Sequence, residues 1–248
     1  MGAVMWDRPD LLNRTANFLY GLGALLAFIA AAAFVIQLPI FPLREIRLDA
    51  SPVHVTRGEI EHGLRDVIRG NFFTLDLEAI RDAFGRLPWV RGVELRRRWP
   101  DSLEVTLEEH VPLARWAGKA LVNTHGELFR AAFDDPLPLF LGPEGAAKEM
   151  AIQYEYFRRG LSSIGRQPVQ VHVSPRRAWQ LTLENGLVLE LGREQIEARL
   201  ARFIGAYERT VATLDQEVRH VDLRYANGFA VRMPRMPGPE RKRGQDKS

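Results

Sequence analysis

The chain has 248 residues, of which 46% are hydrophobic, and it contains no cysteine. This length suffices for a membrane anchor and two small domains that each bury a core. Six basic and two acidic residues lie after Val231, a net +4 that leaves the rest of the chain near −1, although the total is +3. The missing cysteines exclude disulfides and thiolate sites, and the nearly neutral body argues against nucleic acid as a partner.

An uncharged run, FLYGLGALLAFIAAAAFVI, extends from Phe18 to Ile36. As a helix it would be about 28 Å long, which matches the hydrocarbon core of a bilayer. A cleaved signal peptide is the alternative, with Ala30–Ala33 as the cleavage region, but the run is too long for that and stays apolar past the alanines. We therefore expect an uncleaved transmembrane helix over residues 18–38, after a stub of residues 1–17.

The flanking charges do not decide the orientation of this helix. Arg8 and Arg14 precede it, and Arg44, Arg47 and Arg57 follow it. The excess of basic residues that marks the cytoplasmic side is therefore missing. A short cytoplasmic stub with a large translocated C-terminal part is the usual arrangement, and it is our expectation.

Residues 43–112 show the order strand, helix, helix, strand, strand. Thr56 and Glu59 have the spacing of a capping box, and Asp76 suits the N-cap of a second helix that Gly85 ends. The apolar positions recur at helical spacing and then alternate, at Ile46, Leu48, Ile60, Leu64, Ile68, Leu77, Ile80, Phe84, Val93, Leu95, Leu103, Val105 and Leu107. Two helices covering one face of a three-stranded sheet are predicted.

Residues 113–233 predict an antiparallel sheet with helices on one face, so the fold class is α+β. A short hairpin turns at His125-Gly126, and residues 136–145 look like an irregular loop. Helical spacing is found at Met150, Tyr154, Phe157 and Leu161, and again at Ile196, Leu200, Phe203, Tyr207 and Val211. Between these helices Val169, Val171 and Val173 alternate as a strand.

Two further hairpins contain Asn-Gly, at Asn185-Gly186 and Asn227-Gly228. A two-residue loop would set apolar residues opposite polar ones in both hairpins. A three-residue loop with a left-handed glycine places every apolar residue on one face. The predicted pairs are Leu183 with Leu187, Leu181 with Leu189, Trp179 with Leu191, Tyr225 with Phe229, Leu223 with Val231, and Val221 with Met233.

The last predicted strand, Phe229–Met233, is an edge strand with unpaired N–H and C=O groups. Either Pro234 and the charged tail protect this edge, or a partner adds a strand to it. The pattern alone favours neither. Residues 234–248 have the composition of a disordered basic tail.

No catalytic constellation stands out, and we expect no enzyme, no cofactor and no small-molecule substrate. The six histidines lack the spacing of metal ligands, although a site assembled from distant histidines is left open. The segment Gly160–Gly165 has one residue too many for a nucleophile elbow and follows a helix. Arg96–Arg98 lie near glutamates, and the simplest interpretation is a solvated face of the sheet with cross-strand charge pairs. The alternative is that these arginines attract anionic lipid or a partner.

Five segments occur in this order: LPWVRGVELRRRWPDSLEVTLEEHVPLARW (Leu87–Trp116), LFLGPEG (Leu139–Gly145), RRAWQLTLENGLVLELGR (Arg176–Arg193), RLARF (Arg199–Phe203) and VDLRY (Val221–Tyr225). Together they resemble the FtsQ/DivIB family of bacterial cell-division proteins, from the anchor to about Met233. The resemblance implies that residues 43–112 are a POTRA domain and residues 113–233 the β domain of that family.

The resemblance further implies a non-catalytic scaffold of the divisome, in the inner membrane at the division septum, with its N-terminus in the cytoplasm and its bulk in the periplasm. Such a scaffold links early and late division proteins and binds FtsB and FtsL, and FtsB adds a strand to the last strand of the β domain. The resemblance assigns backbone pairing to Phe229, Ala230 and Val231. It assigns the contacts with acidic side chains of FtsB to Arg224 and to one of Arg176 or Arg177. Tyr225 would pack on the added strand. Tyr225 poses a conflict, because the predicted register turns it toward the helices.

Two other functions compete with the scaffold role. A POTRA-bearing factor of protein transport or outer-membrane assembly would be favoured by a barrel or by repeated POTRA units, and the sequence predicts neither. A cell-wall enzyme on a membrane stalk would need a nucleophile, metal ligands or a carboxylate pair in a cleft.

Overall fold

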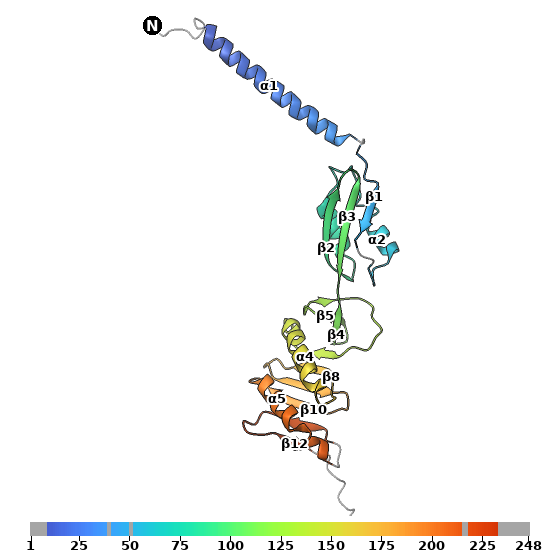
Figure 1. Cartoon of the computed structure of the whole chain (residues 1–248), viewed down its shortest axis with the longest axis vertical. Helices are drawn as coiled ribbons and strands as arrows, with labels where there is room; N and C mark the ends of the chain where they lie inside the picture. The colour runs from blue at the N-terminus through green and yellow to red at the C-terminus, as the bar shows by residue number, and fades with distance from the viewer. Residues whose placement is uncertain (1–8, 39–40, 50–51, 215–217, 233–248) are drawn as a thin grey trace, which may run out of the picture. The chain divides into compact units, whose positions relative to one another are not determined.

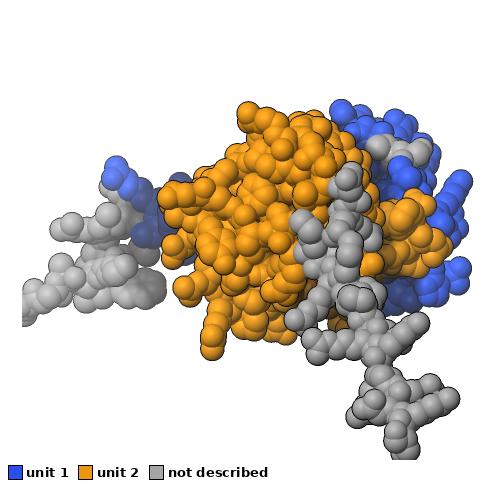
Figure 2. Space-filling view, turned by 90° about the horizontal axis from the view of Figure 1, so that it is seen from below, with its two compact units in different colours: residues 1–109 blue, residues 110–248 orange. Residues whose placement is uncertain are grey.

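The computed structural model describes residues 9–38, 41–49, 52–214 and 218–232, and Figure 1 shows the whole chain. It divides into two compact units, residues 1–109 and 110–248, which Figure 2 colours separately. The predicted tail of residues 234–248, the pairing of Met233 and residues 1–8 of the N-terminal stub lie outside the described residues.

The N-terminal helix α1 (Pro9–Gln37) begins inside the predicted stub. Its segment Asn13–Gln37 is long and apolar enough to cross a membrane, and its side chains are not buried against the rest of the described chain. An apolar helix of this length whose side chains are exposed in the described part of the chain is consistent with a membrane anchor.

The remainder of unit 1 has the predicted order of elements. They are β1 (Glu45–Leu48), α2 (Arg57–Leu64), α3 (Leu77–Gly85), β2 (Val90–Arg98) and β3 (Ser102–Glu109). The sheet order is β1-β3-β2, with β1 parallel and β2 antiparallel to β3. The capping box of Thr56 and the N-cap of Asp76 are both present. The α2 helix ends at Leu64, before the predicted Ile68, which still packs against the core.

The carboxylate of Glu109, at the end of β3, connects two parts of unit 1. The side chain of Glu109 accepts hydrogen bonds from the backbone N–H groups of Val53, His54 and Val55, at 2.9, 3.0 and 2.9 Å. Burial raises the pKa of Glu109, but these donors outweigh that effect and lower its pKa below the usual value. The carboxylate therefore ties the loop before α2 to the sheet.

We predict that Glu109→Gln destabilises unit 1 by about 1–3 kcal/mol at pH 7, because an amide oxygen replaces a charged acceptor of three N–H groups. The folded-state pKa of Glu109 is depressed, so its contribution is present above the unfolded pKa and is lost as the pH falls through the folded pKa. Urea unfolding of both chains at pH 7 and in acid checks this, and an equal difference in stability at both pH values would contradict it.

The described residues of unit 2 form one nine-stranded sheet and two α-helices. Its elements are β4 (Pro112–Trp116), β5 (Ala120–Asn123), β6 (Leu128–Phe129), β7 (Leu139–Leu141), α4 (Ala147–Ser162), β8 (Pro168–Val173), β9 (Trp179–Leu183), β10 (Val188–Gly192), α5 (Ile196–Tyr207), a 3-10 turn η2 (Val211–Thr213), β11 (His220–Asp222) and β12 (Ala230–Arg232). The strand order is β12-β11-β10-β9-β8-β7-β4-β5-β6.

The α+β class is confirmed, and two details of the prediction are wrong. The sheet is mixed, because β10 and β11, β4 and β7, and β7 and β8 pair in parallel. The predicted loop of residues 136–145 contains β7, which is a central strand. A strand of three residues is too short for alternation to be recognised in a sequence.

The helices α4 and α5 lie side by side over one face of this sheet (Figure 1). The predicted apolar positions of both helices supply the core, with Phe157 and Phe203 fully buried. Inward-facing residues of β8, β9 and β10 complete it, including Val171, Leu181 and Leu189. The order and spacing of apolar residues therefore located this core correctly.

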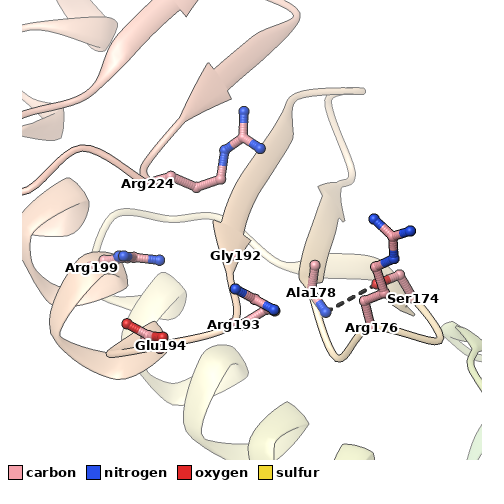
Figure 3. Close-up of a pocket in the computed structure, with 8 residues that line it drawn as sticks. All are labelled: Ser174, Arg176, Ala178, Gly192, Arg193, Glu194, Arg199 and Arg224. Atoms are coloured by element: carbon pink, nitrogen blue, oxygen red, sulfur yellow. Dashed lines mark hydrogen bonds between the residues drawn. The ribbon is translucent and has the colours of Figure 1, made fainter.

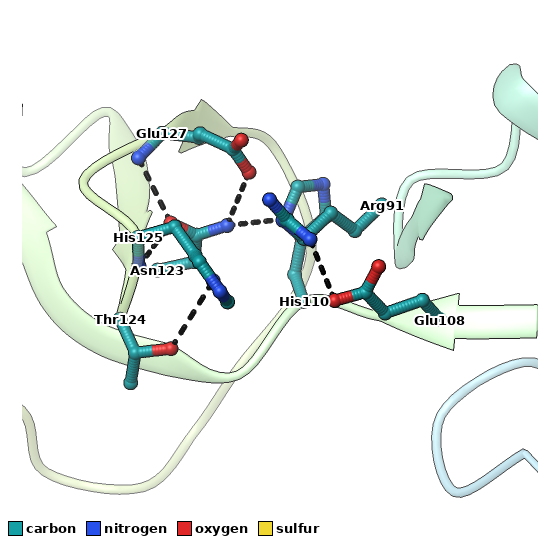
Figure 4. Close-up of polar contacts among 7 residues, drawn as sticks. All are labelled: Arg91, Glu108, His110, Asn123, Thr124, His125 and Glu127. Carbon is teal, nitrogen blue, oxygen red and sulfur yellow. Dashed lines mark hydrogen bonds and ion pairs between the residues drawn. The ribbon is translucent and has the colours of Figure 1, made fainter.

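A polar cluster shapes the β5–β6 hairpin (Figure 4). The buried Asn123 accepts hydrogen bonds from the backbone N–H groups of His125 and Glu127, at 2.9 and 2.8 Å. Its amide nitrogen contacts Glu127 Oε2 at 2.7 Å and His110 Nδ1 at 2.9 Å. These bonds satisfy a buried amide and build the turn, so the cluster has a structural explanation.

The first Asn-Gly hairpin has the predicted three-residue loop. Leu183 N–H donates to Leu187 C=O at 2.9 Å, Gly186 has φ +81°, and Leu181 pairs with Leu189. Trp179 pairs with Gly192 and not with Leu191, because the register shifts between Glu190 and Gly192. That last predicted pair is wrong.

The predicted register of the second Asn-Gly hairpin is wrong. Val221 pairs with Val231, and the strands are joined by the longer loop Leu223–Phe229. The observed register differs from the predicted one by two residues, so both registers put Val221 and Val231 on the same face. Alternation of apolar residues excludes odd shifts and cannot distinguish two even ones.

Candidate partner-binding site

The strand β12 is the last strand of the nine-stranded sheet. Leu223 N–H donates to Glu190 C=O and Val188 N–H donates to Arg219 C=O, so Leu223 and Arg219 turn their backbone groups toward β10. Backbone groups alternate in direction along a strand. The residues 220 and 222 of β11 therefore turn theirs toward β12.

The alternation shows which backbone N–H and C=O groups of β12 do not pair with β11. His220 is opposite Arg232 and Asp222 is opposite Ala230, so the backbone groups of Ala230 and Arg232 face β11. The N–H and C=O of Val231 then point away from β11, at an edge that pairs with no other described strand. One residue of β12 thus presents both a donor and an acceptor to a further strand.

The side chains near this edge divide between core and surface. Phe229 and Val231 are partly buried against the core, and the Phe229 ring meets Phe203 of α5 edge to face at 5.9 Å. Ala230 and Arg232 are exposed. A groove of about 290 Å³ runs beside the strand, lined by Glu190, His220, Asp222, Arg224, Tyr225, Ala230, Val231 and Arg232.

Arg224, which follows β11, is held at this edge by two acidic side chains. Its Nε and Nη2 atoms contact Asp222 Oδ1 and Oδ2 at 2.8 and 2.7 Å, and Nη2 lies 3.3 Å from Glu190 Oε2. The fork of hydrogen bonds from Arg224 lowers the pKa of Asp222, and the same contacts raise the pKa of Arg224. The side chain is still 58% exposed, so it is held in one orientation while remaining accessible.

A glycine makes this orientation of Arg224 possible. Gly192, at the end of β10, has φ +77°, and a Cβ there would lie 3.1 Å from Arg224 Cγ and 2.7 Å from Arg199 Nη1. A larger residue would be strained in that backbone conformation and would displace both arginines.

Four arginines surround one cavity of about 480 Å³, which we term the arginine pocket (Figure 3). It is lined by Ser174, Arg176, Ala178, Gly192, Arg193, Glu194, Arg199 and Arg224. Glu194 is the one acidic residue among these eight. The excess of positive charge suits a carboxylate ligand.

The two candidate arginines of the β8–β9 turn point in different directions. Arg176 lines the arginine pocket together with Arg224. Arg177 has φ +63° and forms an ion pair with Glu149 of α4. Of the two, Arg176 is the one that shares a cavity with Arg224.

Tyr225 lies on the surface beside the groove. Its residue is 58% exposed, whereas Leu223, two positions earlier, is 2% exposed. The Tyr225 carbonyl accepts a hydrogen bond from Arg202 of α5 at 3.0 Å. The expected orientation of Tyr225 toward the helices is wrong, because the loop leaves the strand pattern after Leu223.

Arg193 and Arg199 also line the arginine pocket, and neither was predicted from the sequence. Arg176, Arg193 and Arg224 each follow the C-terminal end of a strand, namely β8, β10 and β11. These three strands run in one direction, since β9 is antiparallel to β8 and β10 and β11 is parallel to β10. A helix between β10 and β11 is the signal of a crossover connection, and it could have indicated this arrangement.

The described part of the chain offers no group of three or more histidine, aspartate or glutamate side chains that could hold a metal ion. The chemical features of the site are an open strand edge, fixed arginines and an exposed tyrosine ring. These features suit recognition of an extended, acidic polypeptide segment.

Comparisons with known proteins agree with this architecture. Residues 41–110 match the family described as POTRA domain, FtsQ-type, and residues 114–224 match Cell division protein FtsQ/DivIB, C-terminal. The chain is 43% identical to Cell division protein FtsQ of Nitrosospira multiformis, over 92% of this chain and 99% of that protein. It is 41% identical to Cell division protein FtsQ of Burkholderia pseudomallei, over 92% and 94%, and 34% identical to that of Bordetella pertussis, over 94% of each chain.

The apolar N-terminal helix and the two matched domains place the chain in the class of POTRA-bearing division proteins. The chain belongs to the FtsQ family of cell-division proteins.

Proposed function

We propose that this chain is a non-catalytic scaffold of the divisome that binds FtsB and FtsL, and that FtsB adds a strand to β12. The observation that carries the proposal is the outward-facing N–H and C=O of Val231 beside the fixed guanidinium of Arg224. Backbone hydrogen bonds would supply affinity, and the neighbouring side chains would select the partner.

In this complex each predicted residue has a distinct part. Val231 offers its backbone groups, and Phe229, two residues earlier, would continue the same edge if the added strand extends that far. Ala230 already pairs with β11, so its contribution is a small exposed side chain that leaves the face of the new strand pair open. Tyr225 would pack on the added strand from the groove.

The acidic side chains of FtsB would form ion pairs with Arg224 and Arg176. Among the described contacts of the Arg224 side chain, Asp222 and Glu190 use Nε and Nη2, so Nη1 can serve a partner carboxylate. We assign the second contact to Arg176 and not to Arg177, because Arg177 already pairs with Glu149.

We further propose that α1 anchors the chain in the inner membrane at the septum, with residues 1–17 in the cytoplasm and the two domains that follow α1 in the periplasm, where the chain links early and late division proteins. Support comes from the apolar helix near the N-terminus and from the family. The rival role in protein transport or outer-membrane assembly is not favoured, because the matches cover 94–99% of the length of division proteins.

Tyr225→Ala tests the proposal at the surface residue. We predict that it weakens binding of the full-length chain to an FtsB/FtsL complex by about tenfold or more, as expected for an interface tyrosine. Its thermal unfolding should match that of the unmodified chain, since the side chain is exposed. Interferometry on detergent-solubilised proteins measures the affinity.

Tyr156→Ala is the matched control, because Tyr156 is also exposed but lies on α4. This variant should bind normally. If Tyr225→Ala binds as tightly as the control, or if it unfolds the domain, Tyr225 does not contact the partner in the way proposed.

A further inference from the structure

The part of unit 1 that follows the membrane helix carries exposed aromatic rings. Trp99, at the turn between β2 and β3, is 77% exposed, and Phe73, in the loop before α3, is 41% exposed. The Phe73 ring also packs edge to face on Phe41, at 5.1 Å. Large exposed rings that belong to one end of a domain indicate a contact surface.

Hydrogen bonds fix the Phe73 loop to the end of α1. The side-chain amide of Asn71 donates to the carbonyls of Ile36 and Leu38, at 2.7 and 2.9 Å. Its Oδ1 accepts from the N–H groups of Phe73 and Thr74, at 3.0 and 2.9 Å. Asn71 is 5% exposed, and all its polar atoms are used. It caps the carbonyl of Ile36, in the last turn of α1, and that of Leu38, just past the end of the helix.

The Trp99 turn belongs to the same end of the unit. Arg44 N–H donates to Asp101 C=O at 2.9 Å, and Glu45 at the start of β1 pairs with Ser102 at the start of β3. Arg97, next to this turn, donates to the carbonyl of Leu75 at 2.7 Å. Five residues lie between Leu38 and Arg44, so the six steps from one Cα to the other span at most about 22 Å.

We propose that this end of unit 1 rests on the bilayer surface, with the rings of Trp99 and Phe73 in the headgroup region. An indole has an apolar body and one N–H donor, and it is the side chain most typical of the membrane–water interface. The proposal rests on the anchoring role proposed for α1 and is independent of FtsB and FtsL.

The contact is aromatic rather than electrostatic. Arg98 pairs with Glu104 at 3.0 Å, and Arg44 lies 3.9 Å from Asp101, so the nearby basic side chains are already partly neutralised. The strong attraction of polybasic segments to anionic lipid is therefore not expected here. The surface should engage zwitterionic lipid as well, and it would restrain the orientation of unit 1 at the membrane.

Single cysteines test this proposal, because the chain has none of its own. The full-length chain is placed in zwitterionic nanodiscs with a fluorophore at Trp99→Cys, Val53→Cys or Leu26→Cys, and lipids that carry a quencher are added. Leu26 lies within α1 and reports insertion. Val53 is 84% exposed and is held by Glu109 at the other end of β3, about 24 Å from Ser102.

We expect the labels at positions 26 and 99 to be quenched several-fold more than the label at position 53. Strong quenching at 26 with equal, weak quenching at 99 and 53 would overturn the surface contact while leaving the anchor intact. Weak quenching at 26 would overturn the anchor and the contact together. If the label at position 99 is shielded from the quencher only after FtsB and FtsL are added, Trp99 belongs to a protein interface instead.

A second pair of labelled chains tests the indole itself, because the label no longer replaces Trp99. The label is moved to Arg98→Cys, in one chain with Trp99 and in another with Trp99→Ser. Lipid quenching should fall when the indole is removed. Equal quenching in the two chains would show that Trp99 does not hold this end of unit 1 at the bilayer.

Discussion

Val231→Pro should weaken binding to FtsB/FtsL by about tenfold to a hundredfold, because a carbonyl of the added strand loses its donor, which costs about 1–3 kcal/mol. The N–H of Val231 faces away from β11, so proline removes no hydrogen bond of the sheet itself. Edge strands tolerate proline at positions whose N–H faces outward. The sheet should therefore fold while the edge is closed to a partner.

Val231→Ala is the control for this variant. It shortens the same partly buried side chain but keeps the N–H group. Titration of both variants with FtsB/FtsL, together with their thermal unfolding, separates lost pairing from lost packing. Equal affinities for the proline and alanine chains would contradict pairing at the Val231 backbone.

Arg224→Ala should cost about 2–5 kcal/mol of binding free energy, the range expected when one partner of a desolvated charge pair is removed. Asp222 and Glu190 then lose their shared cation, which adds repulsion toward an acidic partner. Arg176→Ala should act in the same direction but more weakly, since that side chain is exposed at the rim of the arginine pocket. Both losses should shrink at high salt.

Arg177→Ala supplies the matched control, one residue from Arg176 and of identical type. Its ion pair is with Glu149 on α4, so binding should be unchanged. Affinities measured at two salt concentrations decide between the neighbours. An equal loss for Arg176→Ala and Arg177→Ala would remove the arginine pocket from the interface.

The core and the order of elements could be predicted because they depend on apolar spacing. Phe157 and Phe203 follow from helical periodicity, and Leu181 and Leu189 follow from alternation. The length of the second Asn-Gly loop could not be predicted in this way, since registers that differ by two residues bury the same face. At Gly186 the left-handed glycine fixes the loop, whereas Gly228 does not adopt a positive φ.

The candidate site depends on relationships that periodicity does not contain. Arg193 and Arg224 lie at the same end of the sheet because β10 and β11 are parallel, and the predicted antiparallel sheet did not bring them together. Arg176 and Arg177 are neighbours of the same type, and only the turn conformation separates their directions. Side-chain directions within a turn need the three-dimensional structure.

Hydrogen exchange at the Val231 amide, measured by NMR on the full-length chain with and without FtsB/FtsL, tests strand addition most directly. In the free chain this amide faces outward and should exchange fast, while those of Ala230 and Arg232 are held by β11. Strand addition predicts that Val231 becomes protected in the complex. If the complex forms and Val231 still exchanges as fast as in the free chain, β12 is not the strand to which the partner is added.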